Sequence, residues 1–292
     1  MDTDSLLLDN RYQLAWNEYG VADGEPVFYF HGIPGSRLEA YPADEIARNL
    51  NIRLIVPDRP GYGASDFQNN FSLLDWPRMV TQLADKLDLK RFSILGYSGG
   101  GAYALACAHE IKDRIKHIAL VSSSAPFESE AMLNHINPNL KPLYQLAAAD
   151  YDTAIEKVTV LATSPESFLD VLRLRLPADD KALFKQISFQ KYYLLNLSLA
   201  IAHGVNGIVN DLRNITLPWQ FNLEDIQSHI SIWHGRNNMN IAFPLAEYLD
   251  NKLKNTSSYF LDNTGHYFLF YRWRIILDKL VNQESRHYDV AI

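Results

Sequence analysis

The sequence predicts an α/β protein in which an open, mostly parallel sheet with helices on both faces is interrupted by a helical insertion. Three observations support this fold class. Short, near-continuous apolar runs recur along the chain, as is typical of strands buried on both faces of a parallel sheet. Amphipathic helical patterns alternate with these runs, which indicates βαβ units. From residue 127 to about residue 222 the strand signal disappears and helical patterns follow one another.

Strands and helices alternate in the first part of the chain. Residues 11–20 alternate in polarity like a half-buried edge strand. Buried strands are predicted at 26–32, 52–58, 92–96 and 117–123, with helices at 38–49, 73–87 and 102–111. Strands return at 229–235 and 257–262, and a last helix is predicted at 267–281. We therefore expect a core of residues 1–126 and 223–292 and an insertion of residues 127–222, in which Ser164 and Pro165 begin a helix.

Composition excludes several classes of partner. The formal net charge is −7 and no long basic cluster is present, which argues against nucleic acid. The first ten residues lack the basic end and the long apolar core of a signal peptide, and the most apolar helical stretch, 194–202, is too short to span a bilayer. We expect a cytoplasmic protein. The histidines show no metal-ligand spacing, so no metal or cofactor is predicted.

One serine stands among four glycines where a predicted strand meets a predicted helix, in FSILGYSGGGAYALACAHE (92–110). Gly96 to Gly100 fit the pattern G-x-S-x-G, in which a sharp strand-to-helix turn strains the central residue and projects its side chain above the sheet. The helix that begins there directs backbone N–H groups and its positive dipole end at the same point. An oxyanion beside Ser98 would therefore be stabilised by groups already in place.

Two other interpretations of this segment need no nucleophile. Ser98 would serve equally as the N-cap of a helix. Residues 99–104 also fit the dinucleotide-binding pattern G-x-G-x-x-A, but that site requires an acidic residue about 20 positions later, at the end of the next strand. Here the next strand ends in serines and the first carboxylate is Glu128. The nucleotide interpretation is disfavoured, and a nucleophile is favoured over an N-cap.

Further motifs carry a resemblance to a known family. They are HGIPGS (31–36), PDRPGYGAS (57–65), GYSGGGAYALA (96–106) and a C-terminal WHG (233–235) followed by Gly265-His266. In this order, and over essentially the whole chain, they resemble the single-domain serine hydrolases of the α/β-hydrolase superfamily. The resemblance implies that Ser98 is the nucleophile and His266 the general base, with the backbone N–H groups of Gly99 and Ile33 as oxyanion donors. It also implies that residues 127–222 form a cap, and that His31 and Arg59 have structural roles.

The sequence departs from the family at the third member of the triad. The family has HGxxD after the penultimate strand, and here Asn238 occupies the position of the Asp. An amide accepts a hydrogen bond from the histidine but supplies no charge, and its donor side would favour the wrong tautomer. In a serine protease the same exchange lowers turnover by about 10⁴-fold. Three alternatives stay open: another acid serves, either Glu128 or Asp262; catalysis proceeds weakly without one; or the site only binds a ligand.

A serine nucleophile favours acyl transfer to water and argues against the carboxylate-dependent haloalkane dehalogenase and epoxide hydrolase branches. The insertion contains Phe168, Phe184, Phe189, Tyr192, Tyr193 and Trp219. If some of these line the pocket, the substrate is a small to medium, mainly apolar ester or related acyl compound. For each ring singly, packing within the insertion is the alternative. The sequence thus predicts a serine hydrolase weakened by Asn238, with a non-catalytic binding or interaction protein as the alternative.

Overall fold

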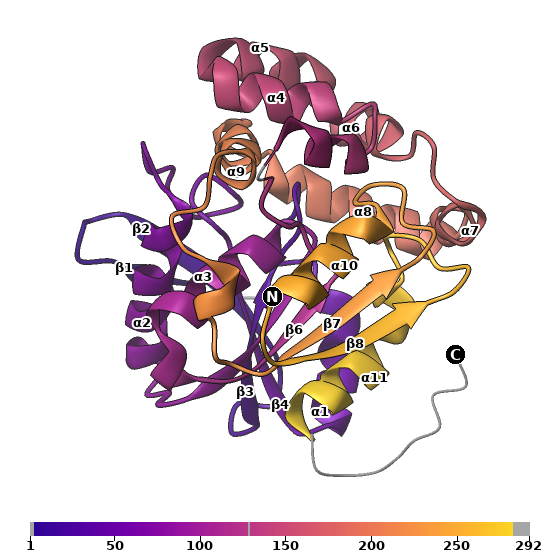
Figure 1. Cartoon of the computed structure of the whole chain (residues 1–292). Helices are drawn as coiled ribbons and strands as arrows, with labels where there is room; N and C mark the ends of the chain where they lie inside the picture. Colours follow the sequence, from indigo (N-terminus) through magenta and orange to yellow (C-terminus); the bar gives the residue numbers. More distant parts are fainter. Residues whose placement is uncertain (1–2, 128, 283–292) are drawn as a thin grey trace.

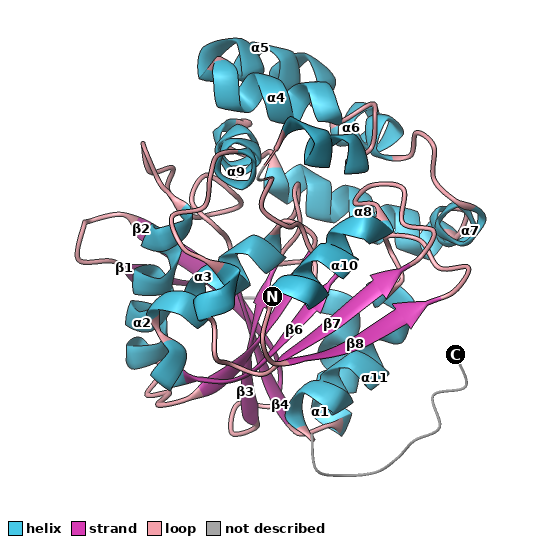
Figure 2. Ribbon diagram, viewed as in Figure 1, coloured by secondary structure: helices cyan, strands magenta, loops and turns pink. Residues whose placement is uncertain are grey.

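The computed structural model describes residues 3–127 and 129–282. Eight strands form one sheet in the order β1-β2-β4-β3-β5-β6-β7-β8 (Figure 2). They are β1 (Asp4–Leu7), β2 (Gln13–Gly20), β3 (Glu25–Phe30), β4 (Ile52–Pro57), β5 (Phe92–Tyr97), β6 (Ile115–Val121), β7 (Ile230–Gly235) and β8 (Thr256–Leu261). Strand β2 is antiparallel to β1 and β4, and the other pairs are parallel. The predicted mostly parallel sheet is confirmed.

Two predicted elements differ in the structure. The strand expected at the edge, β2, lies between β1 and β4, because the short, largely exposed β1 pairs with it and takes the edge. The helix expected over 38–49 begins only at Asp44 and forms α1 (Asp44–Asn49), after a 3₁₀ turn at Tyr41–Ala43. The preceding segment is a succession of tight turns, in which the N–H of Glu39 bonds the carbonyl of Ser36 at 2.9 Å.

Helices cover both faces of the sheet (Figure 1). The bounds are α2 (Trp76–Lys86), α3 (Gly100–Glu110), α10 (Phe243–Lys252) and α11 (Leu269–Val281). Helices α2, α3 and α10 contribute to one hydrophobic core, with Trp76 and Leu249 buried in it. Helices α1 and α11 contribute to a second core, with Ala47 and Trp273 buried in it. The sheet is thus buried on both sides, as its apolar strands require.

Six α-helices lie between β6 and β7 in the described part of the chain, and we call them the helical insertion. They are α4 (Lys141–Ala149), α5 (Tyr151–Leu161), α6 (Pro165–Leu172), α7 (Ala178–Phe184), α8 (Ile187–Ala200) and α9 (Asn206–Thr216). They gather beyond one end of the sheet (Figure 1). Helix α6 begins as predicted, because the Ser164 side chain accepts a bond from the N–H of Ser167 at 3.1 Å. No helix in the two described ranges is long and apolar enough to cross a bilayer.

Candidate active site

Ser98 occupies the turn between β5 and α3 in a left-handed backbone conformation, with φ of 52°. Non-glycine residues rarely adopt this region, so neighbouring contacts have to hold it there. The Ser98 N–H bonds the carbonyl of Val121 at 2.9 Å, and its carbonyl accepts from the N–H of Ser124 at 3.1 Å. The turn is therefore tied to the end of β6. The Ser98 side chain keeps some exposure, at 9% for the residue.

The glycines around Ser98 allow an unusually close approach between α3 and the loop after β3. A Cβ atom on Gly100 would lie 2.1 Å from the carbonyl oxygen of Phe30, which is backbone and cannot move aside. On the adjacent segment, the Ile33 side chain packs directly against Gly99. The structure therefore brings together the two residues whose N–H groups the resemblance implied as oxyanion donors.

The loop of residues 31–35 is fixed by His31 and Arg59. The His31 ring lies 2.9 Å from the Gly32 carbonyl through Nδ1 and accepts the Arg59 N–H at Nε2, at 3.2 Å. The Arg59 guanidinium donates to the carbonyls of His31 and Gly32, at 2.5 and 2.9 Å. All of these bonds are local or to the main chain. The roles implied for both residues, loop shaping and structural bonding, agree with this geometry.

Arg59 also joins the loop to the helical insertion through Asp211 on α9. We call Arg59, Asp211, Tyr62 and Tyr103 the Arg59 cluster. The guanidinium Nε and Nη2 lie 2.9 and 2.7 Å from Asp211 Oδ2, which also accepts from the Tyr62 hydroxyl, while Oδ1 accepts from Tyr103. Burial alone would lower the pKa of Arg59, but the Asp211 carboxylate outweighs it and holds that pKa above its ordinary value.

His266 follows β8 and turns its ring toward Asn238. His266 Nδ1 lies 3.2 Å from Asn238 Oδ1, and the same oxygen accepts the N–H groups of Asn240 and Ile241, each at 3.0 Å. Because two backbone donors fix the orientation of the amide, its oxygen faces the ring and Nδ1 must carry the hydrogen. Nε2 then keeps the lone pair that a general base needs. The amide donor that we expected to favour the wrong tautomer points elsewhere.

That donor points at a second buried histidine. His234 Nε2 lies 2.9 Å from the carbonyl of Ile241 and 3.2 Å from Asn238 Nδ2. A carbonyl only accepts, so Nε2 carries a hydrogen and faces the amide donor without a bond. We call His266, Asn238 and His234 the His266 cluster. Four groups surround the Asn238 amide: the N–H groups of Asn240 and Ile241 and the rings of His266 and His234. All four are donors, and such an environment suits a carboxylate.

The His266 cluster is electrically neutral. Burial, reinforced by the nearby His234, lowers the pKa of His266 to about 3, and burial lowers the pKa of His234 to about 4.

Of the two alternative acids, Asp262 is exposed and forms an ion pair with Arg236 at 3.0 Å, and the position opposite the ring is held by Asn238 instead. This geometry gives no support to the alternative in which Asp262 serves as the triad acid. Glu128 lies outside the described residues.

Ser98 and His266 line one small cavity of about 20 Å³, together with Glu39, Tyr193 and Asn240. A neighbouring cavity of about 30 Å³ shares Ile33, Tyr144 and Leu172 with it and is almost entirely apolar. Each holds little more than a water molecule. A substrate therefore enters only if side chains of the helical insertion move.

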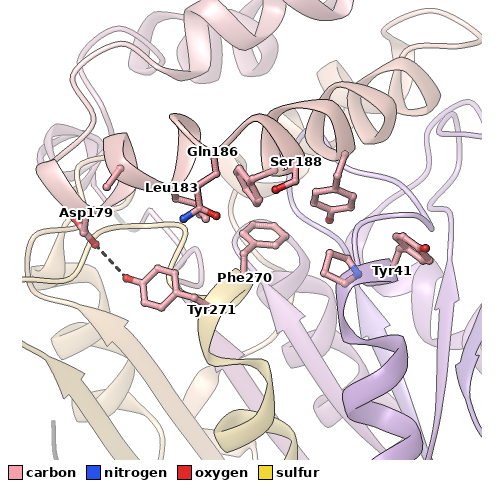
Figure 3. Close-up of a pocket in the computed structure, with 11 residues that line it drawn as sticks. Tyr41, Asp179, Leu183, Gln186, Ser188, Phe270 and Tyr271 are labelled. Carbon is pink, nitrogen blue, oxygen red and sulfur yellow. Dashed lines mark hydrogen bonds between the residues drawn. The ribbon is translucent and has the colours of Figure 1, made fainter.

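The aromatic residues of the insertion that we considered as pocket-lining residues lie in several different parts of the structure. Tyr193 lines the cavity of Ser98, and Phe168 lines the apolar cavity beside it. Phe189 and Tyr192 line a separate groove of about 570 Å³ between α7, α8 and α11 (Figure 3). Phe184 packs against neighbouring rings in the core of the insertion, and Trp219 contacts Phe221. Two of the six rings thus line cavities at Ser98, and the other four lie elsewhere in the insertion or beside it.

Three acidic residues at the site were missed by the sequence analysis. Asp180 on α7 accepts the N–H groups of His266 and Tyr267, at 2.7 and 3.0 Å, and Asp179 accepts that of Gly265 at 2.6 Å. Burial raises the pKa of Asp180 to about 7, and Asp179 adds to the rise. These contacts join residues 86 or 87 positions apart, so no local pattern signals them.

The third missed acid, Glu39, supports the loop that carries Ile33. Its Oε2 atom accepts the N–H of Gly32 at 2.7 Å and the hydroxyl of Tyr29 at 2.9 Å. Burial raises the pKa of Glu39 to about 7, against the opposing effect of these donors. Among the residues that the structure describes, no group of three or more His, Cys, Asp or Glu side chains is arranged to hold a metal ion.

The chain is similar in sequence to curated proteins and similar in fold to solved structures. The chain is 29% identical over 203 residues to the dihydrolipoyllysine-residue acetyltransferase component of the acetoin cleaving system of Pseudomonas putida, an alignment that covers 69% of this chain but spans only about half (51%) of that protein. A hydrolase from Pseudomonas aeruginosa superposes with a TM-score of 0.73 at 15% identity, covering 96% of this chain and 98% of the other. The enol-lactonase of Burkholderia xenovorans gives 0.72 at 14% identity, with 95% and 98% covered.

At such identities the solved structures establish the fold alone. The sequence model of the alpha/beta hydrolase fold matches residues 25–272, which is most of the chain and includes Ser98, Asn238 and His266. The chain therefore belongs to the alpha/beta hydrolase fold family.

Proposed function

We propose that this protein is a serine hydrolase that cleaves small to medium, mainly apolar esters or related acyl compounds, and that Asn238 slows it. The observation that carries the proposal is the strained conformation of Ser98, at φ of 52°, in a cavity that it shares with His266. Strain of this kind persists only where the surroundings hold it and is concentrated at reactive sites. The His266 tautomer, with its lone pair on Nε2, supports the same conclusion.

In the proposed reaction Ser98 Oγ attacks the acyl carbonyl carbon and its proton passes to His266 Nε2. The carbonyl oxygen becomes an oxyanion that accepts from the N–H groups of Gly99 and Ile33. The intermediate collapses to an acyl-enzyme as the leaving alcohol takes the proton from His266. Water then attacks the acyl carbon and gives its proton to His266 Nε2. The second intermediate collapses to the acid as Ser98 Oγ leaves and takes that proton back. Asn238 orients the ring throughout but contributes no charge to stabilise the imidazolium, so both steps are slow.

The surroundings of Ser98 support the substrate class. The apolar cavity beside the serine, which includes Phe168 and Leu172, offers an apolar lining for an acyl chain once side chains of the helical insertion move and enlarge it. In this proposal residues 127–222 act as the cap, since Leu172 and Tyr193 of the insertion close over the serine. The structural likeness to an enol-lactonase is compatible with acyl substrates and does not identify one.

The test is covalent labelling combined with turnover. We expect a fluorophosphonate probe to label the wild-type protein at Ser98, and short p-nitrophenyl esters to be hydrolysed slowly. Ser98→Ala should abolish both, and His266→Ala should abolish turnover while the protein stays folded. Folded wild-type protein that neither labels nor hydrolyses any ester of two to eight acyl carbons would refute the proposal.

A second candidate is a non-catalytic protein that binds a small ligand in the same cavity. The neutral His266 cluster favours it, because nothing there stabilises the charge that catalysis develops. It predicts no turnover in the wild-type protein and unchanged ligand affinity in Ser98→Ala. Slow turnover that depends on Ser98 would exclude it.

A further inference from the structure

Two carboxylates of the helical insertion bind three consecutive backbone N–H groups of the loop that carries His266. Asp179 accepts the N–H of Gly265. Asp180 accepts the N–H of His266 with one oxygen and that of Tyr267 with the other. We call this contact the carboxylate clamp. It joins α7 to the segment between β8 and α11, and the Asp179 side chain also accepts the Tyr271 hydroxyl at 3.3 Å (Figure 3).

The loop is shaped to admit the clamp. A Cβ atom on Gly265 would lie 2.2 Å from Asp180 Oδ2, so only glycine lets the carboxylate come this close. Asp180 is fully buried, and the N–H groups of His266 and Tyr267 satisfy its two oxygens and offset the cost of burying the carboxylate. Moving α7 away would leave buried donors and acceptors unpaired on both sides. Docking of α7 and the position of the loop are therefore coupled.

Each bond in the clamp acts on the main chain of His266 or of a residue next to it. Among the side chains that the structure describes, Asn238 alone is hydrogen-bonded to the ring, at 3.2 Å, and the rings of Tyr97 and Tyr267 pack beside it with centroids 5.3 and 5.1 Å away. A bond of this length to a neutral amide restrains the ring weakly. The placement of the ring relative to Ser98 therefore depends on the backbone from which it projects, since a shift of that backbone moves the ring within these contacts.

We propose that Asp180, supported by Asp179, is a positioning residue that holds His266 in its working place, so that the base is in position only while α7 is docked. The kinetic consequence rests on the proposed function, whereas the structural consequence does not. Misplacing a catalytic group by about 1 Å costs on the order of 10² in rate, mostly in the chemical step. Loss of the clamp should therefore lower kcat and leave KM nearly unchanged.

The kinetic experiment compares Asp180→Ala and Asp180→Asn with a matched control, Asp170→Ala, which removes an exposed carboxylate from α6 of the same insertion. With a p-nitrophenyl ester we expect kcat of Asp180→Ala to fall about 10²-fold and KM to change by less than about threefold. Asp180→Asn keeps one accepting oxygen, so its loss should be about tenfold. Asp170→Ala should match the wild type. A folded Asp180→Ala variant with unchanged kcat, or equal losses in kcat and affinity, overturns the proposal.

Amide hydrogen exchange tests the clamp whether or not the protein is an enzyme. We expect the amides of residues 265–267 to exchange at least about tenfold faster in Asp180→Ala than in Asp170→Ala, while the strands keep their protection. If Asp180→Ala does not fold, Asp180→Asn and Asp179→Asn give the same readout at smaller amplitude. A wild-type protein without turnover refutes the proposed function alone, and unchanged exchange in all clamp variants refutes the clamp alone.

Discussion

The Arg59 cluster and the His266 cluster are both buried polar groups at the site, but they differ in charge. In the Arg59 cluster, Asp211 accepts four bonds, from Arg59 Nε and Nη2 and from the hydroxyls of Tyr62 and Tyr103. In the His266 cluster, the Asn238 oxygen accepts three bonds and the amide nitrogen faces a donor. One cluster contains a full ion pair, whereas the other contains no charge.

The difference separates the framework of the site from its chemistry. A buried ion pair is tolerated where further hydrogen bonds satisfy its remaining atoms, and the Arg59 cluster meets that condition while it fixes the loop after β3. At Asn238 the surrounding donors are arranged as for a carboxylate, yet the carboxylate is absent. The site thus contains the elements that position Ser98 and His266, and it has an amide where a carboxylate would stabilise charge on the imidazole.

The largest effect is expected from restoring the missing charge with Asn238→Asp. A carboxylate there accepts from the two backbone N–H groups and from His266 Nδ1 without moving any of them. It also faces the Nε2–H of His234, which bonds the Ile241 carbonyl, with an acceptor instead of a second donor. We expect kcat/KM for a short ester to rise by about 10² to 10⁴-fold, the reverse of the loss seen when a serine protease exchanges Asp for Asn.

The matched control for this variant is Asn237→Asp, which places the same charge on the exposed neighbouring residue. Its rate should stay within about twofold of the wild type, because an exposed charge is screened by solvent. Real wild-type turnover with no gain in Asn238→Asp would mean that another acid already serves His266, and would make the contrast between the two clusters irrelevant to catalysis.

Breaking the charged cluster should affect stability. Asp211→Ala leaves the Arg59 guanidinium buried without its carboxylate, so we expect a loss of about 3–5 kcal/mol in the free energy of unfolding, measured by urea denaturation. Arg48→Ala, which removes an exposed pair with Asp44, should cost no more than about 1 kcal/mol. A loss below about 1 kcal/mol for Asp211→Ala would show that the Arg59 cluster does not hold the insertion and the loop together.

Much of this arrangement was predictable from the sequence, because its signals are local. Apolar runs marked the central strands, and the glycines around Ser98 marked the strained turn. Strand β1 escaped prediction because it lies at the edge with few buried side chains. The N–H groups that orient the Asn238 amide belong to neighbouring residues, but their direction depends on the fold of the turn. The partners of Asp180 and Asp211 are distant in sequence, and only the tertiary structure brings them together.

The pH dependence of the rate distinguishes the neutral cluster from a charged one. The base works when deprotonated, and burial holds the pKa of His266 at about 3, so protonation of this ring should not lower kcat/KM of the wild type between pH 7 and about 5. Asp180 and Glu39, whose pKa values burial raises to about 7, also titrate in that range, and any loss they cause should be common to the wild type and Asn238→Asp. In Asn238→Asp the carboxylate favours the imidazolium and raises the pKa of His266, so activity should be lost at higher pH than in the wild type. The pH–rate profiles of both proteins, over the range in which circular dichroism shows them folded, give the comparison. Superimposable profiles, with no additional acid limb in Asn238→Asp, would contradict the neutral cluster.

The smallest effect is expected where no charge is involved, in the apolar cavity beside Ser98. Leu172→Ala removes part of the wall of that cavity and enlarges the space. The ratio of kcat/KM for octanoate esters to kcat/KM for butyrate esters should then rise by about tenfold, because apolar contacts of a few carbons discriminate between substrates by about 1–3 kcal/mol. The ratio is independent of how much protein is folded, which matters because a buried leucine also contributes to stability. Leu174→Ala, at an exposed position just beyond α6, is the control. An unchanged ratio in Leu172→Ala would mean that the acyl chain lies elsewhere, with the groove of Figure 3 as the next place to vary.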